Sequence, residues 1–143
     1  MMNMCKIIDN KNNKILVQQR VKSWKGISFP GGKINNGESI VKSTIREVKE
    51  ETGLDIVNLK LCGIKNWYDI EKNERFLIFL YQTNDFSGQL IEKTAEGKNY
   101  WVYESEINQE NLADNFDVIL KIYSDNNLSE MIYSEQNKEW ELF

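Results

Sequence analysis

The chain has 143 residues, of which 41% are hydrophobic and 28% charged, and its formal net charge is −4. It contains no histidine, which excludes nucleophilic catalysis by Ser-His or Cys-His pairs, zinc sites built on imidazole, and histidine acid-base chemistry. The acidic balance gives no diffuse electrostatic attraction for long nucleic acids, so a polyanionic substrate would need metal ions as intermediaries.

These properties predict a single soluble domain over residues 1–143, a length that buries roughly two thirds of the surface of the unfolded chain. No stretch approaches the roughly 20 apolar residues that span a bilayer, and the first ten residues lack the apolar core of a secretory signal. Cys5 and Cys62 lack the spacing of a disulfide framework or a zinc knuckle. We therefore expect a reduced, cytoplasmic protein without a membrane partner, either a monomer or a homodimer.

The first predicted elements are a strand, a tight turn and a helix. Lys14–Gln19, K-I-L-V-Q-Q, has the apolar and β-branched character of a strand. The run Phe29-Pro30-Gly31-Gly32 predicts a turn whose bare backbone can approach a ligand or metal closely. From Ser39 to Thr52 apolar residues recur at helical spacing, and Gly53 is placed to end that helix in a left-handed conformation.

The rest of the chain predicts a sheet and a second helix. Polar or glycine-bearing stretches at 69–74 and 85–88 separate three expected strands, Ile56–Ile64, Arg75–Thr83 and Asn99–Tyr103. Apolar residues from Phe116 to Tyr123 recur at helical spacing, and the pattern fades at 125–127. This second helix should cover the other face of the sheet. Met131–Tyr133 and Glu139–Phe143 are candidates for short terminal strands.

Three glutamates gather on the first predicted helix. At about 100° per residue, Glu47, Glu50 and Glu51 fall within an arc of about 100°. Like charges at these spacings destabilise an isolated helix by about 0.2–0.5 kcal/mol per pair, so a cation should compensate them. Arg46 would do so on a solvated charged face, whereas a metal site would take Mg²⁺ or Mn²⁺, which prefer oxygen ligands.

The residues around these glutamates form a longer motif. Gly32 to Leu54 reads G-K-I-N-N-G-E-S-I-V-K-S-T-I-R-E-V-K-E-E-T-G-L, which meets every position of G-x5-E-x7-R-E-U-x-E-E-x-G-U, with U an aliphatic residue. At average residue usage this match arises at fewer than about one start position in 10⁸. The segment resembles the signature of the Nudix hydrolase family. The resemblance implies an α/β fold, an α/β/α sandwich around a mixed sheet, and hydrolysis of a nucleoside diphosphate linked to another moiety.

The resemblance also implies a metal centre. Glu47, Glu50 and Glu51 would ligate Mg²⁺ or Mn²⁺, and the backbone carbonyl of Gly31 would add a ligand. Arg46 would orient the carboxylates. Among them Glu50 would be the essential carboxylate for the attack of water on phosphorus.

Four further residues acquire roles from the same resemblance. Gly32, Glu38 and Gly53 would be structural positions of the motif, with Glu38 anchoring the junction between loop and helix. Glu96, in the stretch A-E-G-K-N-Y-W-V, lies where many family members supply one further glutamate from a loop, as a metal ligand or base. Its alternative is a solvated loop glutamate.

Short segments outside the motif favour one branch of the family. Gly63–Trp67, Phe86–Gly88 and Glu96–Val102 resemble most the 8-oxo-dGTP diphosphatases. Those enzymes cut the oxidised triphosphate to its monophosphate and pyrophosphate and so keep the lesion out of DNA. The substrate implied is thus a small nucleotide, and no stable nucleic-acid partner is expected.

Candidate substrate-binding residues come from both halves of the chain. Asp114 and Asn115 resemble the stretch that offers a side chain to the purine edge, although both residue types also cap helices. Arg20 and Lys33 would contact phosphates or would be surface cations. Several aromatic residues are candidates to stack on a base, although such side chains usually pack in the core: Trp24, Phe29, Trp67 and Trp101. Trp140 suggests no role.

Other activities fit the same motif. ADP-ribose, dinucleoside polyphosphates and capped RNA are the alternative substrates. ADP-ribose hydrolases of this family often carry a proline after the motif, whereas the only proline here is Pro30. A different class of function is a regulatory module that binds nucleotides without hydrolysis, but such modules usually have eroded motifs and this chain retains all three glutamates.

Overall fold

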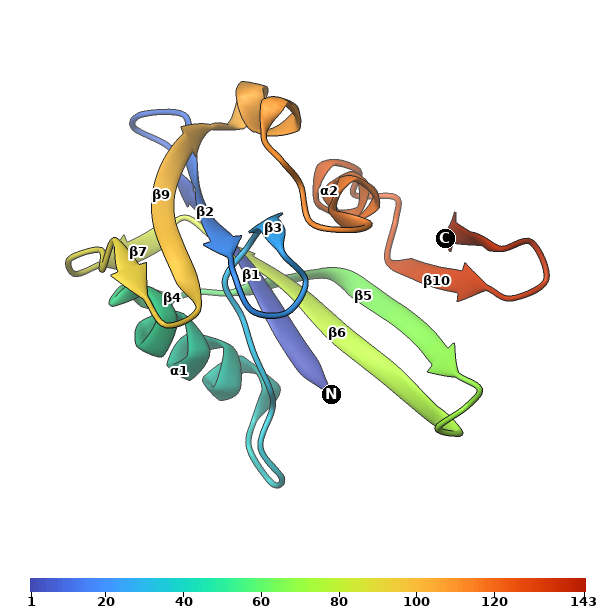
Figure 1. Cartoon of the computed structure of the whole chain (residues 1–143). Coiled ribbons are helices and arrows are strands. Elements are labelled where there is room, and N and C mark those ends of the chain that lie inside the picture. Colours follow the sequence, from blue (N-terminus) through green and yellow to red (C-terminus); the bar gives the residue numbers. More distant parts are fainter.

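The computed structural model describes residues 1–143 and places helices on both sides of a mixed sheet (Figure 1). The strands are β1 (Met2–Asp9), β2 (Lys14–Arg20), β3 (Gly26–Ser28), β4 (Asp55–Val57), β5 (Lys60–Asp69), β6 (Glu74–Thr83), β7 (Asp85–Ser87), β8 (Lys93–Thr94), β9 (Gly97–Tyr103), β10 (Glu130–Ser134) and β11 (Glu139–Leu142). The helices are α1 (Ile40–Thr52), the 3₁₀ helix η1 (Glu104–Gln109) and α2 (Phe116–Ser124). None of these helices is long and apolar enough to cross a membrane.

The order of the strands explains why the sheet opens beside β1. The nine-stranded sheet runs β11-β10-β5-β6-β1-β2-β9-β8, and β3 pairs with β2. β1 is parallel to β6 over residues 2–7, but it pairs with β2 only at Ile8 and Asp9. The two halves of the sheet therefore diverge toward the start of β1, and the segment that follows β3 fills part of the space between them.

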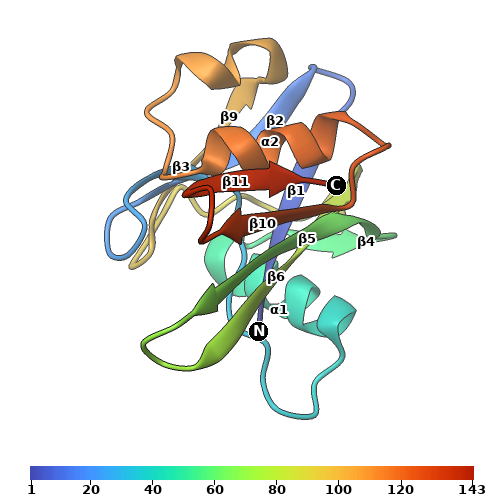
Figure 2. The ribbon, with the colours of Figure 1, turned by 90° about the vertical axis from the view of Figure 1, so that its right-hand side faces the viewer.

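The two helices cover opposite faces of the sheet, as predicted. One core lies between the sheet and α2, where the ring of Phe29 meets Phe116 at 4.8 Å and Tyr123 at 5.3 Å, both edge to face. The other lies against α1 and includes the fully buried Val48. Burying each such side chain contributes about 1.5–3 kcal/mol. Seen from the side, the β10–β11 hairpin lies beneath α2 and extends the sheet beyond β5 (Figure 2).

Helix α1 begins and ends where the sequence predicts. Ser39 occupies the N-cap, and its hydroxyl accepts a hydrogen bond from the N–H of Lys42 at 3.4 Å. Gly53 ends the helix with φ +78°, a left-handed conformation that glycine adopts without steric cost. The predicted second helix and the two terminal strands are also present, as α2, β10 and β11.

Other boundaries differ from the prediction. Strand β1 was not predicted, because a strand in the middle of the sheet with a helix packed against it does not show the alternation of a half-buried strand. The expected strand Ile56–Ile64 is divided into β4 and β5 by Asn58, which has φ +55°. The stretch Asp85–Gly88 is more than a connection, since its first three residues form β7 and pair with β4.

Candidate active site

The turn at Pro30–Gly32 is locked between β1 and α1. The N–H groups of Cys5 and Asn3 donate to the carbonyls of Pro30 and Gly32, both at 2.9 Å. A Cβ on Gly31 would lie 2.2 Å from the carbonyl oxygen of Asn3, and one on Gly32 would lie 2.3 Å from the Oε2 of Glu47. Position 31 therefore requires glycine, because the clash is with backbone, whereas a side chain at position 32 would displace the carboxylate of Glu47. The carbonyl oxygen of Gly31 accepts no hydrogen bond from the chain, which leaves it available to a ligand.

The three glutamates of α1 lie at different depths. Glu51 is buried, with an exposed fraction of 9%. The side chain of Glu47 is 14% exposed and that of Glu50 is 58% exposed. The predicted face of carboxylates thus extends from the protein interior at Glu51 to the solvent at Glu50.

Arg46 connects the start of α1 to its carboxylates. Its guanidinium donates to both carboxylate oxygens of Glu38, at 2.8 and 2.9 Å, and to Glu47 at 2.8 Å and Glu50 at 3.3 Å. It also donates to the carbonyl of Lys33 at 3.1 Å. Hydrogen bonds from Arg46 are the main cause that lowers the pKa of Glu38 to about 2. The guanidinium therefore fixes the loop before the helix and neutralises part of the charge on its surface.

Glu51 meets a buried amide network that sequence reasoning missed. Its Oε2 accepts from the N–H of Gly31 at 3.2 Å and from the Nε2 of Gln18 at 3.3 Å. The Nε2 of Gln18 also donates to the Oδ1 of Asn99 at 3.2 Å, while the Nδ2 of Asn99 donates to the carbonyl of Glu51 at 2.7 Å. Gln18 follows the buried Leu16 by two residues on β2. A polar residue on the inward face of a strand was the available signal.

Burial is the largest influence on the charge of Glu51. It raises the pKa of this carboxyl to about 7, an effect to which nearby Glu47 adds and which the hydrogen bond from Gly31 opposes. Keeping the carboxyl group of Glu51 ionised at this buried position costs free energy unless a positive group compensates its charge.

The carboxylates do not converge on one point. Glu47 and Glu50 are turned toward Arg46, Glu51 is turned inward, and no three acidic side chains are arranged as a metal-binding group. The donor set nevertheless fits a hard divalent cation, because it combines a poorly compensated buried carboxylate, two neighbouring carboxylates and a free carbonyl at Gly31.

A cavity of about 830 Å³ opens beside this turn. Gly31 and Arg20 line one end of it, and Asp114 and Asn115 line it on the α2 side. Arg20 donates to the carbonyl of Ser23 at 3.1 Å. Asn115 occupies the N-cap position of α2 with φ +63°, but its side chain makes no capping hydrogen bond.

Of the predicted residues, Gly31, Arg20, Asp114 and Asn115 line the cavity, whereas Arg46, the three helical glutamates, Lys33 and Glu96 do not. The side chain of Lys33 is exposed and does not line it. Glu96 lies between β8 and β9, where its carboxylate pairs with Lys22 at 3.4 Å and touches none of the three helical glutamates. Its backbone carbonyl accepts from the N–H of Val21, which places Glu96 beside the end of β2.

Aromatic side chains form the other end of the cavity. Trp67 and Phe76 stack with their ring centroids 5.0 Å apart on the β5–β6 hairpin. Trp140, for which the sequence suggested no role, reaches the same cavity from β11. Of the other aromatic candidates, Trp24 is 52% exposed at the cavity rim, whereas Trp101 packs against the α1 core and does not line the cavity.

Comparison with known proteins identifies the family. The NUDIX domain family model matches residues 2–121. The uncharacterized Nudix hydrolase YvcI of Bacillus subtilis is 31% identical over 98 residues, which are 66% of this chain and 61% of that protein. The putative 8-oxo-dGTP diphosphatase YtkD of Bacillus subtilis is 41% identical over 64 residues, 36% of this chain and 40% of that protein. These alignments therefore leave more than a third of each relative uncovered.

Solved structures give the same result over nearly the whole length. The chain matches the crystal structure of a MutT protein from Bacillus halodurans with a TM-score of 0.79 and 27% identity, over 99% of this chain and 95% of that one. The names of further curated relatives range from ADP-ribose pyrophosphatase to NAD-capped RNA hydrolase. The family match covers the turn, the helical carboxylates and most of the cavity walls, and the chain therefore belongs to the Nudix hydrolase family.

Proposed function

We propose that this Nudix hydrolase is a metal-dependent pyrophosphohydrolase that converts an oxidised purine nucleoside triphosphate, such as 8-oxo-dGTP, to its monophosphate and pyrophosphate. The observation that carries the proposal is the cavity, which runs from the glycine turn beside the buried Glu51 to the aromatic walls at Trp67 and Phe76. Its volume of about 830 Å³ suits a nucleotide. The likeness to MutT proteins and to YtkD supports the choice of an oxidised purine.

The carboxylate end would hold the metal. Glu47, Glu50, Glu51 and the carbonyl of Gly31 would be the ligands of Mg²⁺ or Mn²⁺, once Glu47 and Glu50 turn away from Arg46. A divalent cation supplies positive charge to the triphosphate and lowers the pKa of water near it. Arg46 would then keep the loop before the helix in place through the contacts it already makes with Glu38 and the carbonyl of Lys33.

The chain's own groups would position and deprotonate the nucleophile. Water attacks a phosphorus atom of the bond that is cut, a new P–O bond forms, and the bond from that phosphorus to the bridging oxygen breaks, which releases the monophosphate and pyrophosphate. The exposed carboxylate of Glu50 accepts the proton of the attacking water. Arg20, at the same end of the cavity, would contact a phosphate oxygen. Glu96 would serve as a second proton acceptor or ligand only if its loop moves toward the helix.

Asp114 and Asn115 would contact the base. Both line the cavity, and the side chain of Asn115 is not used to cap α2. The aromatic side chains would stack on the faces of the ring. Such an enzyme would remove damaged precursors from the nucleotide pool before a polymerase incorporates them.

The test is a comparison of substrates with and without Mg²⁺, with products identified by mass. The substrates are 8-oxo-dGTP, dGTP, ADP-ribose and a diadenosine polyphosphate, and the enzymes are wild type, Glu50→Gln and the control Glu106→Gln, an exposed glutamate of η1. We expect Mg²⁺-dependent release of 8-oxo-dGMP and pyrophosphate by wild type and Glu106→Gln. Preference for ADP-ribose or another substrate would overturn the choice of substrate, and binding without turnover of any of them would indicate the regulatory module instead.

A further inference from the structure

The side chain of Lys65 lines the cavity, and its ammonium group has no hydrogen-bond acceptor in the protein. It lies on β5 and lines the cavity, with its Nζ 4.6 Å from the ring centroid of Trp140 and 5.7 Å from that of Trp67. It forms neither a salt bridge nor a hydrogen bond with any other residue, whereas the other two cavity cations have protein acceptors. Arg20 donates to the carbonyl of Ser23, and Lys72 lies 3.5 Å from the carboxylate of Asp69.

The surroundings of Lys65 make the lack of an acceptor costly. The two indoles remove water from the ammonium group, although their faces attract it. Burial lowers the pKa of Lys65, an effect that the charge of Asp114 opposes. Lys65 is partly buried, and a polar group that is removed from water normally has a hydrogen-bond partner, which a ligand in the cavity would supply.

The charges near Lys65 indicate which ligand group it meets. The acidic residues that line the cavity are Asp69, Glu71, Asp114 and Glu135, and the basic ones beyond Arg20 are Lys65 and Lys72. Acidic groups outnumber basic ones in this part of the cavity, so it would repel a phosphate group of the ligand. A neutral edge that offers an acceptor to Lys65 and donors to Asp114 would satisfy both side chains.

A guanine-type base has such an edge. Its O6 is an acceptor and its N2 amino group is a donor, with the N1–H between them, whereas adenine presents an amino donor in place of O6. We propose that Lys65 is a specificity-determining residue, an inference that rests on the proposed function. Lys65 donates a hydrogen bond to O6 of a guanine-type base, and Asp114 accepts hydrogen bonds from the N1–H and the N2 amino group. Adenine would leave the ammonium facing a donor.

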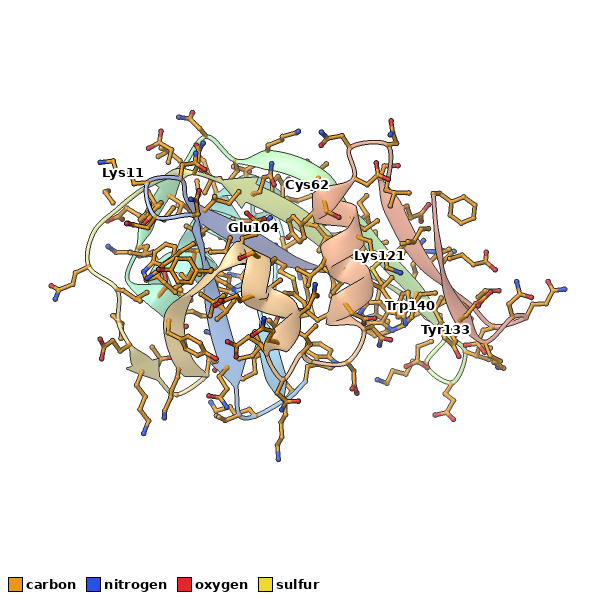
Figure 3. The ribbon with its side chains drawn as sticks, turned by 90° about the horizontal axis from the view of Figure 1, so that it is seen from above. Lys11, Cys62, Glu104, Lys121, Tyr133 and Trp140 are labelled. Carbon is orange, nitrogen blue, oxygen red and sulfur yellow. The ribbon has the colours of Figure 1, made fainter.

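The C-terminal hairpin holds Lys65 in this position. Trp140 and Tyr133 lie together on the hairpin, with ring centroids 5.5 Å apart (Figure 3). Trp140 presents its ring to Lys65 from a segment that follows the residues matched by the family model, which end at 121. The hairpin therefore adds a wall to the base end of the cavity.

The experiment measures binding of deoxynucleoside monophosphates, which have no pyrophosphate bond to cut. Isothermal titration with dGMP, dIMP and dAMP in Mg²⁺ compares wild type, Lys65→Met, Lys65→Arg and Lys60→Met. Methionine keeps an apolar chain between the indoles, arginine restores a donor, and Lys60 is an exposed lysine at the start of β5 that does not line the cavity. A thermal melt of each variant checks that it is folded.

We expect wild type and Lys60→Met to bind dGMP and dIMP about 10- to 100-fold more tightly than dAMP. Lys65→Met should lose that preference, because its affinity for dGMP and dIMP falls while its affinity for dAMP stays the same. Lys65→Arg should retain most of the preference. Asp114→Asn should weaken dGMP more than dIMP, which lacks the N2 amino group.

Equal binding of dGMP and dAMP by folded wild type would overturn the inference. So would an equal loss of affinity for all three nucleotides in Lys65→Met, because it would show a general electrostatic or packing role. Neither outcome depends on turnover. Failure of the proposed hydrolysis would appear separately, as an inactive enzyme that still prefers dGMP.

Discussion

The carboxylates around α1, beside the cavity, already have a cationic partner, whereas the ammonium of Lys65 inside the cavity has no acceptor. Arg46 serves Glu38, Glu47 and Glu50 at once. The carboxylates come from one continuous stretch of chain, residues 38–51, and the aromatic end of the cavity comes from β5, β6, the start of α2 and the C-terminal hairpin. The difference suggests that the chemistry belongs to the continuous segment and the choice of base to the assembled one.

The largest expected effect separates the two ends directly. Glu50→Gln removes the exposed carboxylate proposed to accept the proton, and kcat should fall about 10²- to 10⁴-fold. Affinity for dGMP should change less than threefold, because Glu50 does not line the cavity. Steady-state kinetics and titration of the same preparation measure both quantities. A parallel loss of affinity and kcat would break the proposed division.

The next effect concerns the turn that joins the two ends. Gly31→Ala would place a Cβ 2.2 Å from the carbonyl of Asn3, so the turn and β1 must separate. We expect a loss of about 1–3 kcal/mol in the free energy of unfolding and a large loss of activity.

Gly37→Ala is the matched control for this substitution. Gly37 has φ +76° with no atom within 4 Å of the added methyl group. Its replacement should cost about 1 kcal/mol from backbone strain alone and leave kcat near wild type. Urea unfolding and kinetic assays compare the two variants, and equal activity in both would contradict the role given to the turn.

A smaller effect is expected at the aromatic end. Trp140→Leu removes the ring that contacts Lys65 and Tyr133. We expect affinity for dGMP to fall about 3- to 10-fold, while kcat stays within twofold. Tyr103→Leu, which removes an exposed aromatic side chain outside the cavity, is the control. If Trp140→Leu leaves the affinity for dGMP unchanged, the hairpin is not part of the base site.

The smallest effect is a change in the acid dependence of folding stability. Contact with Arg46 lowers the pKa of Glu38 from 4.5 to about 2. The pair therefore stabilises the fold above about pH 4.5, and this contribution is lost as the pH falls toward about 2. The difference in unfolding free energy between wild type and Glu38→Gln should shrink over that range. Urea unfolding at several pH values measures it, and parallel curves would contradict the assignment.

Local features of the sequence determined much of this protein. The motif at 32–54, the helical spacing from Ser39 and the glycine at 53 predicted the bounds of α1 and the common face of its glutamates, because these depend on residues within a few turns of one another. The longer strands after the helix were found as well, apart from the break at Asn58, where a single left-handed residue interrupts an apolar run. The short strands β7 and β8 were not predicted.

Tertiary structure decided the rest, because pairing between distant segments leaves no local pattern. Strand β1 becomes evident only through its pairing with β6. The role of the buried Gln18 becomes evident only through its hydrogen bonds to Glu51 and Asn99. The approach of Trp140 to Lys65 joins residues 75 positions apart, through a parallel pairing of β10 with β5 that no periodicity could indicate. The sequence thus revealed the carboxylates of the candidate site, and only the fold assembled the wall that we propose selects the base.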